Sequence, residues 1–181
     1  EKLGVVVFAL DIANHEETDA FAAFVEERLG DRGLSALINV AGISGPGSGL
    51  LEGVSPENAK LTVDVNLHGT LNMVRSFLPL LRKYGPARIV NVSSGNLTPA
   101  PFTGVYLVSK FGVEGITNVL RYEMAPFGIQ ATSVEPAGMK TNMTKNAEER
   151  TKQTWDRMGE KVKNAYYDKI NPSLEFMNRV I

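Results

Sequence analysis

The chain has 181 residues, of which 43% are hydrophobic and 22% are charged, and its formal net charge is -1. This composition is ordinary for one globular domain, long enough to bury roughly 70% of the surface that its unfolded chain exposes. A charge this close to zero provides no basic face for nucleic acid. The absence of cysteine excludes disulfides, a thiol nucleophile and thiolate metal ligands. No apolar run approaches the roughly 18 residues of a membrane span.

Short apolar runs alternate with longer segments of helical period, which predicts an α/β fold with a parallel sheet flanked by helices. Each predicted strand is rich in Val and Ile and is apolar on both faces, as a strand covered on both sides should be. The predicted strands are residues 4–10, 36–40, 88–92 and 130–134. The predicted helices are residues 16–29, about 56–83 and about 104 to 126 or 128, followed by a polar helical region after Thr141.

Tyr106 and Lys110 are the side chains most suggestive of chemistry, because an i, i+4 spacing places them on one helix face. A phenol is a poor base near neutral pH until a nearby cation stabilises the phenolate. Lys110 can supply that charge. Ser94 ends the strand twelve residues before Tyr106, at the carboxyl edge where open α/β sheets bind ligands. The three groups together can move a proton on and off an alcohol oxygen.

Taken alone, the Tyr106–Lys110 pair has a simpler explanation, since such pairs occur on many solvated helices. Two further features favour a site. One is the strand that ends at Ser94. The other is a face of small residues on the same helix, which would allow close approach of a cofactor or another helix: Ser109, Gly112 and Gly115. His15 and His68 are too isolated to form a metal site, so no metal is predicted.

The chain resembles the short-chain dehydrogenases/reductases, and within them the retinol and hydroxysteroid dehydrogenase branch, from about residue 9 to residue 144. The most specific segments are Ile-Val-Asn-Val-Ser-Ser at 89–94 and Tyr-Leu-Val-Ser-Lys-Phe-Gly-Val-Glu at 106–114. Phe-Gly-Ile at 127–129 and Val-Glu-Pro at 134–136 continue the pattern. The resemblance implies a Rossmann-like, doubly wound parallel sheet with helices on both faces.

The resemblance also implies catalytic roles. Tyr106 would be the general acid/base, and Ser94 would hydrogen-bond the reacting oxygen. Lys110 would stabilise the phenolate and hold the nicotinamide ribose. Asn66 matches the family asparagine that bends a helix and anchors a proton-relay water. Without the family, Asn66 would be read as a polar residue at the edge of an amphipathic helix.

Cofactor contacts are implied at several strand ends. Asn39, Ala41 and Gly42 belong to Asn-Val-Ala-Gly, which resembles the family's Asn-Asn-Ala-Gly, and Gly42 would let the backbone approach the adenine ribose. Val40 replaces the second asparagine, which puts one hydrogen bond in doubt. Asp11 matches the residue that reaches the adenine amino group, although an aspartate just past a strand is more often a turn former.

The loop after the last predicted strand is similar to the family's Pro-Gly-x-x-x-Thr loop. Pro136, Ala137 and Thr141 would contact the nicotinamide end of the cofactor, with Thr141 at the carboxamide. Ala137 stands where glycine is usual. If that position needs a positive φ, the alanine costs roughly 1 kcal/mol or shifts the loop.

The family's Thr-Gly-x-x-x-Gly-x-Gly turn, whose amides bind pyrophosphate, does not occur in this sequence. The first predicted strand matches the family's third. The expectation is therefore a single partial domain that lacks the first βαβ unit and stops early at Ile181, with a cofactor and catalytic core at about 1–143 and a substrate-covering helical region at about 144–181. On its own, such a chain would bind dinucleotide weakly. The choice between NAD and NADP stays open, with the family favouring NAD.

The predicted activity is hydride transfer between NAD or NADP and a small apolar alcohol or ketone, such as a steroid or retinoid. The family implies a homo-oligomer and an intracellular protein, and it leaves attachment to the endoplasmic reticulum or another membrane open. An alternative is a catalytically silent relative that serves as a ligand- or partner-binding module, supported by Val40, Ala137 and the absent phosphate turn. A shortened product that does not fold stably is a third possibility.

Overall fold

The computed structural model describes residues 4–44, 48–95, 101–137, 147–167 and 169. Three parallel strands form its sheet in the order β1-β2-β3: β1 (Ala36–Asn39), β2 (Arg88–Val92) and β3 (Gln130–Val134). The register places Asn39 opposite Asn91, and Val92 opposite Val134. The predicted parallel α/β architecture is confirmed, and these three strands agree with the predicted runs to within one residue.

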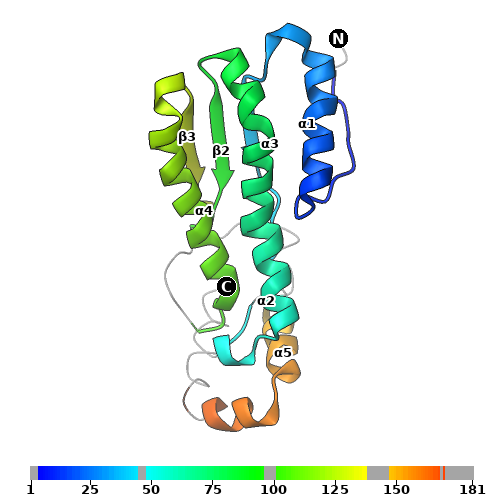
Figure 1. The fold of residues 1–181 in the computed structure, drawn as a ribbon. Coiled ribbons are helices and arrows are strands. Elements are labelled where there is room, and N and C mark those ends of the chain that lie inside the picture. Colours follow the sequence, from blue (N-terminus) through cyan, green and yellow to red (C-terminus); the bar gives the residue numbers. More distant parts are fainter. Residues whose placement is uncertain (1–3, 45–47, 96–100, 138–146, 168, 170–181) are drawn as a thin grey trace.

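α1, α3 and α4 stand side by side in one layer beside the sheet, with α3 between α1 and α4, and α2 and α5 lie beyond the end of the sheet (Figure 1). α3 contacts β1, α4 contacts β2 and β3, and α1 packs on α3. Their bounds are α1 (His15–Leu29), α2 (Pro56–Val63), α3 (Gly69–Tyr84), α4 (Gly104–Glu123) and α5 (Ala147–Arg157). Short 3-10 turns are Gly30–Arg32, Leu51–Gly53 and Ala125–Phe127.

The helix boundaries follow the capping signals of the sequence. The Asn14 side chain accepts hydrogen bonds from the first amides of α1, and Gly30 ends that helix with φ 56°. Ser55 caps α2 by accepting from the Asn58 amide, and Pro56 occupies the first turn. These contacts satisfy backbone donors that a helix start otherwise leaves unpaired.

The long helix predicted over residues 56–83 forms, but it contains one turn of a different kind. Between α2 and α3, Asp64–His68 forms a π turn, in which the Gly69 amide donates to the Asp64 carbonyl five residues earlier. A π turn inserts an extra residue into the helix and is often found at functional sites. It carries Asn66, which is 1% exposed.

The main core lies between the helix layer and one face of the sheet. Along each strand the side chains alternate between the two faces of the sheet, and Leu37, Ile89 and Ala131 are buried on the face toward the helices. Val74, Phe77 and Leu81 of α3 close the core from the other side. On the opposite face, Ile38 and Val134 are exposed. The described helices therefore cover one face of the described sheet.

The predicted strand at residues 4–10 is wrong. The segment forms no strand in the structure, and Val5, Val6 and Val7 are exposed. A β-strand exists only through hydrogen bonds to a neighbour, and this segment pairs with none of the three strands. Phe8 instead packs on α1, with its ring centroid 4.9 Å from that of Phe21 and 5.0 Å from that of Phe24. The aromatic side chains of α1 therefore pack against an extended segment that belongs to no strand of the described sheet.

A second, smaller cluster lies away from the main core. Leu50, Phe102 and Met158 are buried together, and three partly buried side chains pack around them: Trp155, Val162 and Tyr166. The polar region predicted to be helical contributes α5 and a further helical segment at 160–167. Among the helices in the described ranges, none combines the length and apolar character that a membrane crossing requires.

Substitution of two glycines near the end of α1 would distinguish the effect of backbone strain from that of steric crowding. Both have positive φ, 56° at Gly30 and 72° at Gly33. A Cβ added at Gly30 would meet nothing within 4 Å, whereas at Gly33 it would lie 2.5 Å from the Tyr84 amide nitrogen. We expect Gly30→Ala to lower the free energy of unfolding by about 1–3 kcal/mol through strain alone. Gly33→Ala should cost about 2 kcal/mol more, because backbone must move.

Chemical denaturation of the two variants beside the parent protein measures this difference. Equal losses for Gly30→Ala and Gly33→Ala would show that the Gly33 turn adapts and that the contact with α3 is not close-packed.

Candidate active site

The carboxyl edge of the sheet brings the segments after β2 and β3 together. The Ser93 amide donates to the Val134 carbonyl at 2.8 Å, and the Gly95 amide donates to the Pro136 carbonyl at 2.9 Å. Half-buried Ser94 lies between these two bonds. The predicted catalytic serine is therefore held beside the loop that begins at Pro136, as expected for residues leaving the same edge of a parallel sheet.

Lys110 reaches this edge from α4. Its Nζ donates to the Val92 carbonyl at 2.9 Å, and the residue is 4% exposed. Burial lowers the pKa of the Lys110 ammonium from its usual value, because desolvation disfavours the charged form. In the described part of the chain Lys110 forms no ion pair with a carboxylate. Its charge is thus available to a group bound at the edge.

Asn66 connects the π turn with two other elements. Its Oδ1 accepts from the Ile43 amide at 2.8 Å, and its Nδ2 donates to the Ile43 carbonyl at 2.8 Å. Nδ2 also donates to Ser109 Oγ on α4 at 2.9 Å. One amide side chain therefore fixes the loop after β1 and the helix that carries Lys110. The sequence suggested a special role for Asn66 only through the family.

Tyr106 lies in the first turn of α4 and is half-buried. Its carbonyl accepts from Ser109 Oγ at 2.7 Å, and Ser109 in turn receives the bond from Asn66. The backbone at Tyr106 is thus joined to the π turn through one hydroxyl. The close approach predicted for the small face of α4 is real at Ser109 and at Gly112, where an added Cβ would lie 2.6 Å from Leu67 Cδ1.

Gly42 faces the same group of residues. A Cβ added there would lie 3.2 Å from Asn66 Oδ1 and 3.3 Å from Lys110 Nζ. Any side chain would therefore press on both. The structure places Gly42, Asn66 and Lys110 together, with Tyr106 one helical turn before Lys110.

Asn39 starts a buried polar chain that the sequence did not reveal. Its Nδ2 donates to Asn91 Oδ1 at 2.8 Å, and Asn91 Nδ2 donates to Thr117 Oγ1 at 2.9 Å. Both Asn91 and Thr117 are fully buried. An asparagine inside the apolar run at 89–92 was the available signal, since a buried amide needs partners. This series of hydrogen bonds joins β1, β2 and α4 near the carboxyl edge of the sheet.

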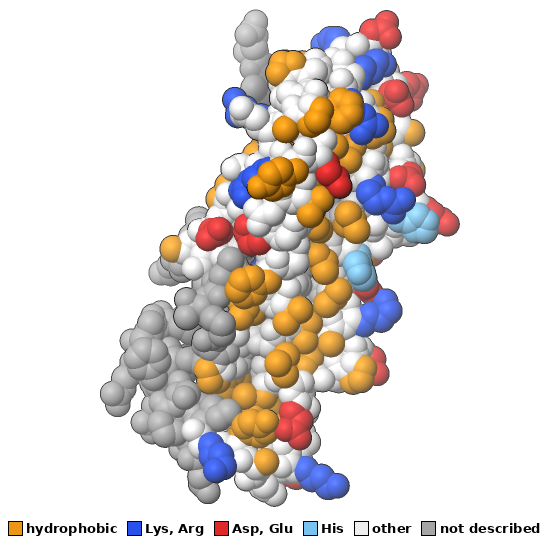
Figure 2. Space-filling view, turned by 60° about the vertical axis from the view of Figure 1, so that its left-hand side comes forward, with side chains coloured by type: hydrophobic (Ala, Val, Ile, Leu, Met, Phe, Trp, Pro, Cys, Tyr) orange, Lys and Arg blue, Asp and Glu red, His pale blue; other side chains and the backbone are white. Residues whose placement is uncertain are grey.

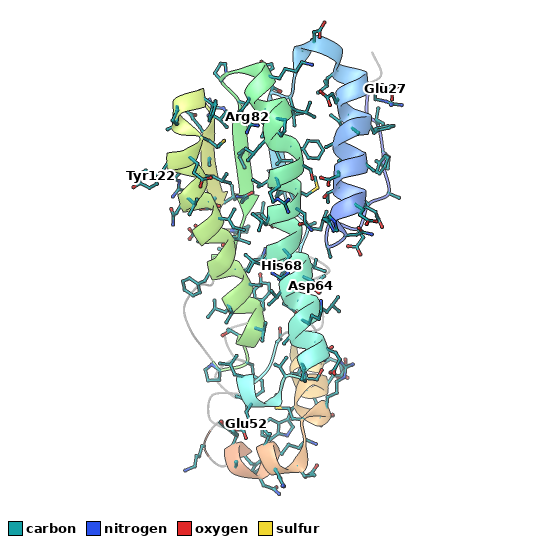
Figure 3. The ribbon with its side chains drawn as sticks, in the orientation of Figure 1. Glu27, Glu52, Asp64, His68, Arg82 and Tyr122 are labelled. Carbon is teal, nitrogen blue, oxygen red and sulfur yellow. The ribbon has the colours of Figure 1, made fainter. Side chains whose placement is uncertain are left out.

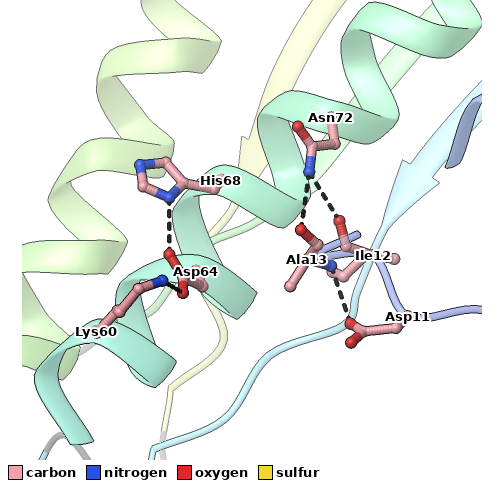
Figure 4. Close-up of polar contacts among 7 residues, drawn as sticks. All are labelled: Asp11, Ile12, Ala13, Lys60, Asp64, His68 and Asn72. Carbon is pink, nitrogen blue, oxygen red and sulfur yellow. Dashed lines mark hydrogen bonds and ion pairs between the residues drawn. The ribbon is translucent and has the colours of Figure 1, made fainter. Parts of the chain in front are cut away.

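Asp11 does not contact this group within the described residues. Its Oδ1 accepts from the Ala13 amide at 3.0 Å, so it forms the turn that leads into α1. Asn72 of α3 holds the same turn by donating to the Ile12 carbonyl at 3.1 Å and the Ala13 carbonyl at 3.4 Å (Figure 4).

The remaining predicted cofactor residues are placed as follows. Ala41 is exposed beside Gly42, and Ala137 is exposed after half-buried Pro136. Phe102 is the one non-glycine residue with positive φ in the described ranges, so Ala137 carries no strain of the kind anticipated. Thr141 lies outside the described residues.

A parallel sheet with helices packed on it, and with Ser94 and the Lys110 ammonium at its carboxyl edge, is consistent with a Rossmann-like fold. The comparisons give the family. The model for "short chain dehydrogenase" matches residues 1–152, and the chain belongs to this family.

Mouse 17-beta-hydroxysteroid dehydrogenase type 6 is 41% identical over 160 residues, covering 87% of this chain and 50% of that protein. Rat retinol dehydrogenase 7 is 37% identical over 166 residues, covering 91% and 52%. The chain thus spans about half the length of the curated relatives it matches.

Solved structures agree with the family. A short chain dehydrogenase from Burkholderia cenocepacia in complex with NADP superposes with a TM-score of 0.69 at 34% identity, covering 78% of this chain and 59% of that one. Carveol dehydrogenase from Mycobacterium avium in complex with NAD gives a TM-score of 0.72 at 27% identity, covering 78% and 50%. The predicted short-chain dehydrogenase resemblance and Rossmann-like fold are confirmed.

An Asn66→Asp substitution tests how much the hydrogen bonds donated by the Asn66 side chain contribute to stability. Asn66→Asp keeps an acceptor for the Ile43 amide but loses both donations, and it places a carboxylate beside the Ile43 carbonyl. We expect Asn66→Asp to lower the free energy of unfolding by about 2–4 kcal/mol. Asn72→Asp, which loses donor bonds at a partly exposed site, should cost about 1 kcal/mol. Chemical denaturation measures both values. Equal losses would contradict the central role of the Asn66 amide.

Proposed function

We propose that the protein is an NAD(P)-dependent oxidoreductase that interconverts an alcohol and a carbonyl, with Tyr106 as the general acid/base. The observation that carries this proposal is the position of Lys110. Its buried ammonium lies at the carboxyl edge between the Val92 carbonyl and Gly42, one helical turn after Tyr106. A cation at that place, with no carboxylate partner among the residues that the structure describes, can stabilise a phenolate and bind sugar hydroxyls.

In the oxidation direction, Tyr106 as phenolate takes the proton from the substrate hydroxyl. Ser94 hydrogen-bonds the same oxygen and orients it. Lys110 holds positive charge beside the phenolate. Asn66 keeps α4 and the loop after β1 in place, and it lies on the route by which the proton leaves. In the reduction direction, Tyr106 returns the proton to the forming alkoxide.

The residues present fit a nicotinamide dinucleotide. Gly42 leaves the space beside Lys110 and Asn66 without a side chain, so backbone can approach a ribose there. We assign Asn39, Ala41 and Gly42 to the adenosine side, and Pro136, Ala137 and Thr141 to the nicotinamide side. Asp11 is assigned to the adenine. The nicotinamide supplies the hydride acceptor or donor when bound.

The substrate class proposed is a small apolar alcohol or ketone, such as a steroid or retinoid. The curated relatives with 37% to 41% identity are named retinol and 17-beta-hydroxysteroid dehydrogenases, which supports this choice. Residues about 144–181 would cover the substrate, and the apolar side chains of Trp155 and Met158 support that assignment. NAD is favoured over NADP by family resemblance alone.

Tyr106→Phe tests the proposal directly, because it removes the acidic hydroxyl and keeps the ring. We expect the turnover rate to fall about 10²- to 10⁴-fold, the range that general acid/base catalysis supplies. Nicotinamide absorbance at about 340 nm follows the reaction, with steroid, retinoid and short-chain alcohols as substrates. The protein should be expressed from its complete gene.

Tyr84→Phe is the matched control. Tyr84 is 47% exposed at the end of α3, shortly before β2 begins, and so lies at the opposite end of the sheet from the carboxyl edge. It should leave turnover unchanged. A parent protein that binds the dinucleotide but turns over no alcohol or ketone would refute the enzyme and favour the alternative, a ligand- or partner-binding module.

We further propose that the protein forms a homo-oligomer through α4. Hydrophobic side chains gather on the face over α4 and the neighbouring α3 (Figure 2). On α4 the exposed members are Val108, Phe111, Val119 and Tyr122, and Tyr122 points away from the helix layer (Figure 3). An exposed apolar stripe of this kind is typical of a protein–protein contact. Gly115 lies within the stripe, and a Cβ added to it would meet nothing within 4 Å.

Gly115→Arg should reduce the molar mass measured by light scattering to that of one subunit, because a long charged side chain would project from the stripe. The substitution is compatible with the fold, since Gly115 has open space and a helical backbone. Gly159→Arg is the control at another glycine with nothing within 4 Å. An oligomer unchanged by Gly115→Arg would exclude α4 as its interface.

A further inference from the structure

Phe102 combines an unfavourable backbone with a buried side chain. Its φ is 69°, the one positive value outside glycine in the described ranges, and it is 6% exposed. An L-residue with a β-carbon disfavours this region, especially a bulky one. Such a conformation persists only where the surroundings hold it. The contacts around Phe102 therefore show what determines its position.

The side chain of Phe102 is held by the second cluster. It packs with Leu50 and Met158, and its ring centroid is 6.2 Å from that of Trp155 on α5. Its carbonyl accepts from the Gly49 amide at 2.9 Å. The cluster thus clamps Phe102 from both the side chain and the backbone.

The surroundings of Phe102 are close-packed against the α5 region. A Cβ added at Gly49 would lie 3.0 Å from Thr154 Cγ2 and 3.2 Å from Met158 Cε. A Cβ at Gly53 would lie 2.7 Å from Met158 Sδ. Met158 therefore fills a space left by two glycines. Because the packing is close, a displacement of α5 would displace the side chains that contact Phe102.

Phe102 is also two residues before α4 begins at Gly104. Gly104 has φ 43°, so the chain turns sharply between Phe102 and the helix. In the first turn of the helix, the Leu107 amide donates a hydrogen bond to the Thr103 carbonyl at 3.2 Å. Tyr106 lies in this first turn. A shift of Phe102 would move the turn that carries Tyr106.

We propose that Phe102 is a positioning residue through which the packing of α5, Trp155 and Met158 fixes the first turn of α4 and hence Tyr106. The proposal rests on the proposed function in so far as Tyr106 is the acid/base. The packing of α5 and the first turn of α4 are thereby coupled: when α5 is packed on Phe102, the first turn of α4 is formed. When α5 is released, the left-handed Phe102 relaxes and that turn opens.

The coupling makes the covering region part of the catalytic geometry. A helical region that only shielded substrate from water would leave α4 unchanged when displaced. Here an apolar substrate that stabilises the α5 region would also favour the turn at Tyr106. Polar or very small alcohols, which add no apolar contact, would be turned over more slowly even when the dinucleotide is bound.

Met158→Ala tests the link without touching α4. Trp155 is the single tryptophan of the chain, so its fluorescence reports packing of α5. We expect its emission to shift to longer wavelength, and amide hydrogen exchange in residues 105–110 to accelerate at least about tenfold, because local opening becomes easier. Exchange in β2 should stay unchanged. An emission shift with no change in exchange at 105–110 would overturn the proposal.

Phe102→Gly tests the same link from the other side and covers the case in which Met158→Ala leaves α5 in place or fails to fold. Glycine accepts φ 69° without strain but removes the anchor. Exchange at 105–110 should again accelerate about tenfold or more, and Phe102→Leu should restore most of the protection. Unchanged exchange in Phe102→Gly would refute the positioning role. Phe127→Ala, at an aromatic residue 49% exposed beyond the far end of α4, is the control.

Kinetics supply the functional arm. In Met158→Ala the turnover number should fall about tenfold while the Kd of the dinucleotide changes less than about twofold, because the turn that carries Tyr106 opens while the Lys110 side chain keeps its hydrogen bond to the Val92 carbonyl. A general loss of structure would lower the turnover number and also raise the Kd of the dinucleotide. If the parent protein turns over nothing, the proposed dehydrogenase function fails, while the exchange experiment still decides whether Phe102 couples α5 to α4.

Discussion

The pairing between the Asn66 amide and the backbone of Ile43 is the interaction on which the rest of the site depends. An amide side chain can donate and accept at once, so it matches the amide and carbonyl of one residue as a neighbouring strand would. The loop after β1 is thereby fixed without a strand of its own. The remaining donor of Asn66 reaches Ser109 on α4. Three elements distant in sequence are thus held by one buried side chain.

The π turn explains how Asn66 reaches these partners. In a regular helix the backbone at Asn66 would continue the i to i−4 pattern, and a one-residue insertion changes the direction of the side chain. Thr70 Oγ1 donates to the Asn66 carbonyl at 2.8 Å, which gives the backbone of the irregular turn a side-chain hydrogen bond. The irregularity is therefore supported locally by Thr70 and across the fold by Ile43. The helix departs from regular geometry at this turn, and the buried Asn66 side chain gains hydrogen bonds for its oxygen and its nitrogen.

The buried charge of Lys110 depends on the same arrangement. An ammonium that is 4% exposed loses hydration, and one carbonyl replaces only part of it. The cost appears as a lowered pKa. A residue placed there for stability alone would be better as an apolar side chain of similar volume. Its position beside Gly42, where an added Cβ would lie 3.3 Å from Nζ, is consistent with a charge kept for a ligand rather than for the fold.

The sequence was sufficient where local and long-range preferences agree. β2 is a Val- and Ile-rich run, β3 ends in Val134 before a proline-containing loop, and α2 begins at Pro56 after the Ser55 cap, as the capping rules predict. It was insufficient where the outcome depends on a distant partner. The apolar run at 4–10 has strand character but no neighbour to pair with in this structure. A π turn at Asn66 depends on Ile43, which lies 23 residues away.

Phe102 shows the same limit from another direction. No propensity places an aromatic residue at φ 69°, so its conformation follows from contacts with residues about 50 positions before and after it. The positions of Ser94, Tyr106 and Lys110 could be predicted because their spacing is tied to one helix and one strand end, and the roles proposed for them rest on the family resemblance. The site is thus readable in sequence where a single element carries it.

The two halves of the proposed cofactor site differ in how they are built. On the reacting side, Lys110 and Asn66 are buried and bonded to backbone, so their positions are set before any ligand arrives. On the adenosine side, Val40 is 63% exposed and Asn39 already uses its amide in the chain to Asn91. Recognition there falls to the backbone at Ala41 and Gly42. In the proposed dehydrogenase, these residues would therefore contribute orientation of the nicotinamide end more than affinity for the nucleotide as a whole.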